Sequence, residues 1–159
     1  MNVTDATLSK NSVIVIGYGN TLRSDDGVGQ RVASEVQGWE LPSVRSLPVH
    51  QLTPELAETL QGAKGVIFVD AYPISEEKNI VQITPIEPID ANNFSLGHSS
   101  DPRVLLGLTQ AIYSYSPPAW LITIPALNFE FGENLSPITQ QGLAIALNEI
   151  RDLLLVIDC

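Results

Sequence analysis

Cysteine is almost absent from this sequence. Its one cysteine, Cys159, is the last of 159 residues. A single cysteine excludes an internal disulfide and a thiolate metal cluster. At a chain end Cys159 also lacks a scaffold that would activate it as a nucleophile.

Long apolar runs are lacking too. No run approaches the ~20 residues that cross a bilayer. The polar stretch Met1–Lys10 has neither the basic start nor the apolar centre of a signal peptide. We therefore expect a soluble, cytoplasmic protein that does not associate with a membrane.

Basic residues are few. Eight lysines and arginines stand against eighteen acidic residues, which gives a net charge of −10. A negative chain repels phosphate backbones, so we expect no nucleic-acid partner. Solubility is the simplest reason for the excess of acid, and attraction of a cation or a partner is the alternative.

The motifs of nucleotide binding and serine hydrolysis are also missing. The stretch 17–22, Gly-Tyr-Gly-Asn-Thr-Leu, lacks the third glycine of a GxGxxG turn. Two carboxylates, Asp25 and Asp26, follow where a pyrophosphate would have to lie. The sequence contains no GxxxxGK[ST] loop and no GxSxG elbow.

The sequence does contain strand patterns that alternate with helical ones. Strands are predicted at Val13–Ile16, Ser43–His50, Gly65–Asp70, Ile80–Thr84 and Trp120–Ile124. Helix starts are predicted at Thr53-Pro54, Asp101-Pro102 and Ser136-Pro137. Apolar helix faces are predicted at Val28, Val32 and Val36, at Leu105, Leu108 and Ile112, and at Leu143, Leu147, Ile150 and Leu154. This order indicates an α/β fold with a mostly parallel, covered sheet, formed by one domain over residues 12–159 after a loose tail, 1–11.

Polar side chains follow the predicted strands at the edge where α/β sheets bind ligands. Asp25 and Asp26 follow the first strand, Asp70 ends the third, and His98 lies in the loop before the helix at Asp101. Two carboxylates and an imidazole suit a divalent first-row metal with open positions for water or substrate.

Each of these residues has another interpretation. Asp25 is well placed to cap the following helix, and we favour that role for it over metal binding. Asp26 can act as a first-turn acid that favours the helix dipole. His98 can be a simple loop residue, and His50 competes with it because it too follows a strand.

The ordered motifs resemble a known family. The pattern G-x-G-N-x-L-x-x-D-D/E-x-x-G occurs here as Gly17, Gly19, Asn20, Leu22, Asp25, Asp26 and Gly29. Together with the Val66–Asp70 strand followed by Ala71, and with the His98-bearing segment 96–103, it resembles the nickel–iron hydrogenase maturation endopeptidases. The His98 segment is most similar to the cyanobacterial-type branch that serves bidirectional hydrogenases.

The resemblance implies a three-layer αβα sandwich around a twisted sheet of about five strands. It implies an endopeptidase that removes the C-terminal extension of the hydrogenase large-subunit precursor after nickel insertion. Asp26, Asp70 and His98 would be the metal-binding and catalytic residues, and the nickel they recognise would be held by the substrate. Some members have glutamate at the position of Asp26, so Asp25 stays an alternative first ligand. The other function that this site suits is a non-catalytic nickel carrier or chaperone.

The precursor of the large subunit is thus the expected partner, and we expect the free protein to be a monomer. Aromatic residues in the segment Tyr113–Trp120 are one candidate for the docking surface. We favour the simpler interpretation, in which Tyr115 and Trp120 close the core.

Overall fold

The computed structural model describes residues 12–90 and 101–158. Its one sheet contains β1 (Val13–Tyr18), β2 (Val44–Val49), β3 (Gly65–Pro73), β4 (Gln82–Ile86) and β5 (Ala119–Ala126). The strand order is β2-β1-β3-β5-β4. Every pair is parallel except β4 with β5, which is antiparallel. The predicted mostly parallel sheet of about five strands is therefore confirmed.

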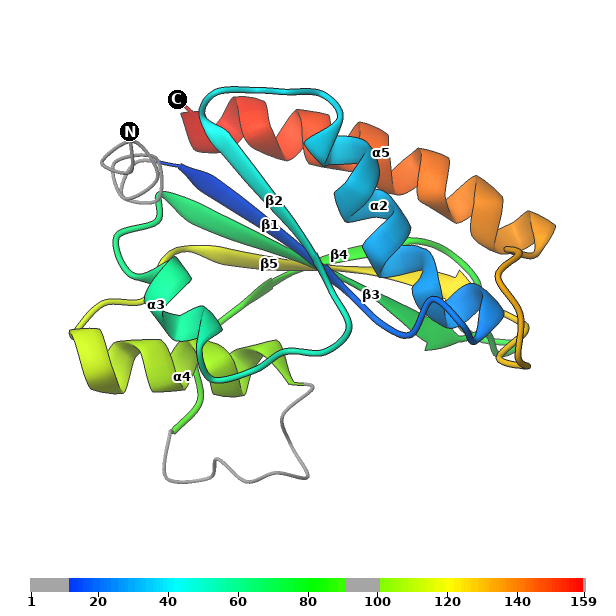
Figure 1. Ribbon diagram of the computed structural model, residues 1–159, viewed down its shortest axis with the longest axis horizontal. Coiled ribbons are helices and arrows are strands. Elements are labelled where there is room, and N and C mark those ends of the chain that lie inside the picture. Colours follow the sequence, from blue (N-terminus) through cyan, green and yellow to red (C-terminus); the bar gives the residue numbers. More distant parts are fainter. Residues whose placement is uncertain (1–11, 91–100, 159) are drawn as a thin grey trace.

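Helices cover both faces of this sheet (Figure 1). The helices α2 (Val28–Gln37) and α5 (Pro137–Asp158) lie on one face, and α3 (Leu56–Leu60) and α4 (Pro102–Tyr113) lie on the other. The layers are thus helix, sheet and helix, as predicted. None of the described helices is long and apolar enough to cross a bilayer.

Two cores follow from the alternation of side chains along the buried strands. Val13 and Val15 of β1 pack in the core that α2 and α5 close. Ile14 and Ile16 pack in the core that α3 and α4 close. Because β1 is buried on both faces, all of its residues 13–16 are apolar.

Two of the three predicted helix starts are confirmed. Asp101 caps α4, because its side chain accepts a hydrogen bond from Arg103 N at 2.9 Å, and Pro102 is the first helical residue. Likewise α5 begins at Pro137.

The third predicted start is wrong. The helix α3 begins at Leu56, and Thr53 makes no cap for it. Its backbone carbonyl instead accepts from Leu56 N in a turn that precedes the helix.

The predicted apolar face of α4 is partly wrong as well. Leu105 is buried and Leu108 is partly buried, but Ile112 is 57% exposed. Val104 and Leu106 are buried instead, so the buried face of α4 is rotated by about one residue. Sequence spacing predicts that α4 has an apolar face, but packing against α3 and the sheet decides which residues of that face are buried.

The strand order places a topological switch point between two neighbouring strands. From β1 the chain passes through α2 to β2, on one side of β1. From β3 it passes to β4, α4 and β5, on the opposite side. The connections that leave the carboxyl ends of β1 and β3 therefore diverge, and such switch points are where open α/β sheets bind their ligands.

Candidate functional site

Close backbone packing holds the connection from β1 to α2 against the sheet. A Cβ atom on Gly17 would lie 1.8 Å from the carbonyl oxygen of Gly29. A Cβ atom on Gly29 would lie 2.5 Å from the carbonyl oxygens of both Tyr18 and Val69. The first turn of α2 thus rests directly on β1 and β3. Gly17 is therefore a residue of β1 and not of the turn, and its lack of a side chain lets the helix approach.

The turn itself begins at Gly19, whose φ is +142°. A side chain there would also meet the carbonyl oxygen of Asp26 at 2.0 Å. After this glycine the chain forms the short 3-10 helix η1 (Ser24–Gly27), which leads into α2. The Asp26 carboxylate is oriented by Asn20, whose backbone N–H donates to its Oδ2 at 2.9 Å.

Asp70 lies in β3, the strand beside β1, and faces the same edge. Its Oδ1 accepts a hydrogen bond from Ala71 N at 2.8 Å. Burial raises the pKa of the Asp70 carboxyl to about 6, and the charge of Asp26 adds to the rise against the opposing hydrogen bonds of Ala71 and Tyr18. The structure therefore brings Asp26 and Asp70 close enough to repel each other.

Tyr18 is a site residue that the sequence analysis missed. Its side chain is 4% exposed and its hydroxyl is hydrogen-bonded to the Asp70 side chain. Burial raises the pKa of this hydroxyl above its ordinary value, and the charges of Asp70 and Asp101 raise it further. The clue available in the sequence is alternation, because Tyr18 continues the series of Ile14 and Ile16 toward the α3 and α4 face.

His98 lies outside the described residues. The described chain resumes at Asp101, three positions later, and the Asp101 carboxylate acts electrostatically on Tyr18. Asp101 thus connects the start of α4 with the Tyr18–Asp70 pair.

Asp25 has a different environment from its neighbour Asp26. It is completely buried, and its carboxylate accepts hydrogen bonds from Leu127 N and Asn128 N at 2.9 Å and from Ser136 N and Oγ at 2.7 Å. Burial alone would raise the pKa of Asp25, but these hydrogen bonds outweigh it and lower the pKa below its usual value. The predicted capping role is wrong, since the N-cap of α2 is Gly27, with no side-chain cap.

His50 follows β2 at the same edge of the sheet. Its carbonyl oxygen accepts from Gly19 N at 3.2 Å, and its side chain is exposed. Within residues 12–90 and 101–158 no three His, Cys, Asp or Glu side chains gather closely enough to hold a metal. His50 therefore does not complete a three-ligand group with Asp26 and Asp70 in this arrangement.

The pair of carboxylates is suited to a cation. Each is oriented by a backbone N–H, and the two repel each other at a half-buried edge, so a divalent cation between them would relieve the repulsion. Carboxylate and imidazole donors are common ligands of divalent first-row metals. The donor set thus fits a metal that is bound by these two aspartates and one further ligand.

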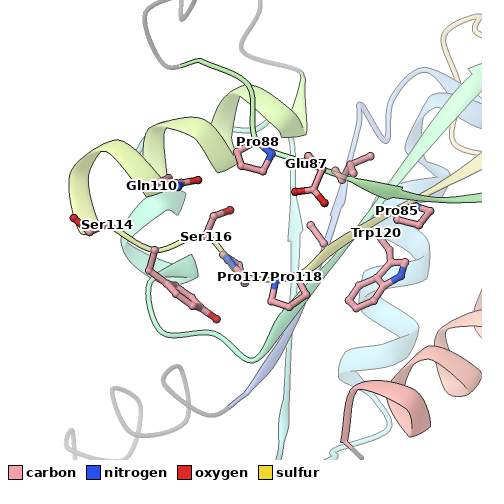
Figure 2. A pocket seen from close by; sticks show the side chains of 12 residues that line it. Pro85, Glu87, Pro88, Gln110, Ser114, Ser116, Pro117, Pro118 and Trp120 are labelled. Carbon is pink, nitrogen blue, oxygen red and sulfur yellow. The ribbon is translucent and has the colours of Figure 1, made fainter.

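A cavity of about 590 Å³ lies at the other end of the sheet (Figure 2). It lies between the end of β4 and the segment 114–120, where β5 begins. Ala119 pairs with Val66 at the start of β3, whereas Asp70 pairs with Thr123 further along. The cavity is therefore separate from the two aspartates.

This cavity is lined by residues 114–120 of the aromatic segment that is one candidate for the docking surface. Trp120 packs against the core beneath α5, as the simpler interpretation predicted. Tyr115 is 38% exposed, and its hydroxyl donates to the carbonyl oxygen of Ala63. The prediction that both residues close the core is therefore confirmed for Trp120 and wrong for Tyr115, which is exposed and belongs to neither core.

Comparisons by sequence find no match, either to a protein-family model or to a curated protein. Solved structures do match over most of the chain. Hydrogenase 2 maturation peptidase from Thaumarchaeota archaeon SCGC_AB-539-E09 has a TM-score of 0.65 and 21% sequence identity, over 90% of this chain and 97% of that one. The nickel–iron hydrogenase maturation protease HybD from Thermococcus kodakarensis has a TM-score of 0.67 and 18% identity, over 89% and 98%.

The hydrogenase maturating endopeptidase HybD from E. coli gives a third likeness, with a TM-score of 0.65 and 17% identity over 87% of this chain and 89% of that one. At such identities a likeness establishes the fold. The chain therefore has the fold of the hydrogenase maturation endopeptidases.

Proposed function

We propose that this protein is an endopeptidase that removes the C-terminal extension of a nickel–iron hydrogenase large-subunit precursor after nickel insertion. The observation that carries the proposal is the pairing of Asp26 and Asp70 at the switch point of this fold. The neighbours of the same fold are named as a maturation peptidase, a maturation protease and a maturating endopeptidase of hydrogenases, which supports a peptidase.

In this proposal Asp26, Asp70 and His98 recognise the nickel that the substrate already holds. The proximity of Asp101 to the Tyr18–Asp70 pair supports the choice of His98. Three residues span at most ~11 Å, and His98 precedes Asp101 by three positions in the sequence. The failure of His50 to complete a ligand group with the two aspartates supports the same choice.

The chain's own residues would orient the ligands. Asn20 N fixes the Asp26 carboxylate, and Ala71 N and the Tyr18 hydroxyl fix that of Asp70. Bound nickel would supply Lewis acidity toward the scissile carbonyl or a nearby water. Asp70, with a pKa of about 6, is the described carboxyl best placed to hold or release a proton at this site near neutral pH.

The remaining parts of the proposal come from the sequence. They are a cytoplasmic location, a monomeric free protein, and service to a bidirectional hydrogenase of the cyanobacterial type. Nickel recognition before cleavage would make the enzyme act only on correctly loaded precursor.

The test is incubation of the purified protein with nickel-loaded large-subunit precursor, followed by mass spectrometry. We expect loss of a short C-terminal peptide with the wild type. Asp70→Asn and His98→Ala should abolish cleavage, and His50→Ala should retain it as the matched histidine control.

Two outcomes contradict parts of this assignment. A precursor that stays full length with a wild-type protein that binds nickel would support the non-catalytic carrier instead. Cleavage by His98→Ala together with inactivity of His50→Ala would show that His50 is the third ligand.

A further inference from the structure

Three apolar side chains stand exposed beside the candidate site. Leu22 is 49% exposed, Leu127 is 62% exposed and Phe131 is 87% exposed. We call these three residues the rim platform. They lie on the connection from β1 to α2 and on the loop between β5 and α5, which run side by side at the carboxyl edge of the sheet (Figure 1).

The two segments of the rim platform are joined by backbone pairing. Arg23 and Gly132 form a parallel bridge, in which Gly132 N donates to Leu22 O at 2.8 Å and Ser24 N donates to Gly132 O at 2.7 Å. Leu22 precedes one bridge residue and Phe131 precedes the other, so the two lie next to each other. Leu127 lies on the same loop as Phe131, and its N–H donates to buried Asp25, three positions after Leu22.

Further hydrogen bonds hold this loop in place. Ser24 Oγ donates to Glu130 O at 2.7 Å, and Arg23 Nε donates to Phe129 O at 3.1 Å. Together with the buried Asp25 carboxylate they fix the loop at several points. The backbone that carries these solvent-exposed apolar side chains is therefore fixed by hydrogen bonds. Exposed apolar side chains that gather on one surface are typical of an interaction site.

The nature of the partner follows from charge and from adjacency. The rim platform rests on Asp25, and the next residue, Asp26, forms the acidic pair with Asp70. The acidic pair is complementary to a cation, but apolar side chains contribute nothing to the binding of a free hydrated ion. A protein that presents a bound divalent cation at its surface matches both features at once.

We propose that Leu22, Leu127 and Phe131 are the docking surface for such a metal-loaded protein. This inference rests on the proposed function, under which that partner is the nickel-loaded large-subunit precursor. The rim platform contacts the precursor's protein surface while Asp26 and Asp70 face its metal. Affinity for the precursor and recognition of nickel are then separate properties of neighbouring residues.

The test uses the full-length double variant Leu127→Ser, Phe131→Ser in the cleavage assay with nickel-loaded precursor. We expect KM to rise at least tenfold and kcat to stay within twofold of the wild type, because apolar docking residues are lost without a change in the acidic pair. Binding of free Ni²⁺ should be unchanged. Ile112→Ser, which removes a 57% exposed side chain from α4, is the matched control and should leave KM unaltered.

The outcomes separate the inference from the function on which it rests. Wild-type cleavage with an unchanged KM in the double variant overturns the docking surface and leaves the function intact. A wild type that neither binds nor cleaves the precursor overturns both. Urea unfolding of the double variant checks that it folds. The single variant Phe131→Leu, which keeps Leu127 and an apolar side chain at position 131, should have a KM close to that of the wild type.

Discussion

The neighbouring residues Asp25 and Asp26 differ in burial and in hydrogen bonding. Asp25 is buried and accepts four hydrogen bonds from the far end of the chain, whereas Asp26 stays half-buried at the sheet edge and accepts from Asn20 N. The sequence predicted that both matter and that Asp26 is the better ligand. It did not predict what Asp25 does, because its donors lie 102 to 111 residues away and leave no local pattern.

At Asp70 the structure predicts a dependence of stability on pH in metal-free protein. The folded pKa is about 6 and the usual value is 3.8, so the folded chain binds more protons between these pH values and loses stability as pH rises through them. An asparagine side chain at this position would carry no charge at any pH. We expect Asp70→Asn to exceed the wild type in unfolding free energy by roughly 1 to 3 kcal/mol above pH 7, since one pKa unit corresponds to ~1.4 kcal/mol.

Urea unfolding in the presence of a chelator, repeated from about pH 4 to pH 8, measures this difference. The difference should shrink toward the acid end, where Asp70 is protonated in the folded wild type and becomes protonated in the unfolded wild type as pH approaches 3.8. Other carboxyl groups titrate over the same range, but they are shared by the two proteins and cancel in the comparison. A constant difference across the whole range would show that Asp70 does not titrate as described.

At the scale of elements, the strand–turn–helix unit from β1 to α2 was the best predicted part of the chain. A β-branched run followed by glycines and a helical valine repeat indicates that unit by local rules alone. Long-range packing explains where prediction failed. Thr53 is followed by a turn and caps no helix, and Ile112 of α4 is exposed because neighbouring elements decide which side is buried.

The contact between α2 and the sheet gives a prediction for Gly29→Ala. Its new Cβ atom would meet two backbone oxygens at 2.5 Å, and backbone cannot move aside as a flexible side chain does. We expect a loss of at least about 2 kcal/mol of unfolding free energy, toward the upper end of overpacking costs. Thermal and urea unfolding measure it.

Gly38→Ala is the control for that substitution. Gly38 ends α2 with φ of −67°, and a Cβ atom there would approach Glu35 O to 3.3 Å. Alanine is favoured over glycine in helical conformation by about 1 kcal/mol, which offsets the mild crowding. Equal losses in the two variants would contradict the tight contact at Gly29.

For the whole molecule, the net charge of −10 and the acidic pair together favour cation binding. We expect Ni²⁺ to raise the melting temperature, because a ligand that binds only the folded state adds about 2.7 kcal/mol at one hundred times its dissociation constant. Under our assignment the effect should weaken as His98 protonates below its reference pKa of about 6.5.

Differential scanning fluorimetry with and without Ni²⁺ measures this shift. His98→Ala should abolish most of it and His50→Ala should leave it in place. The opposite result would exchange the two histidines, and a shift that survives Asp26→Ala and Asp70→Asn together would place the metal elsewhere on the protein.

The hydrogen bonds between Asp25 and the loop after β5 also bear on when the site can form during folding. Residues of the first connection are fixed by donors up to 111 positions later, beyond the last strand. Contacts of such long range require the closure of a large loop before they contribute, so they form late in folding. On the ribosome, a nascent chain that ends before residue 136 would lack the support beneath Asp26. The hydrogen bonds that fix Asp25, the neighbour of Asp26, would therefore form only once synthesis has passed the start of α5.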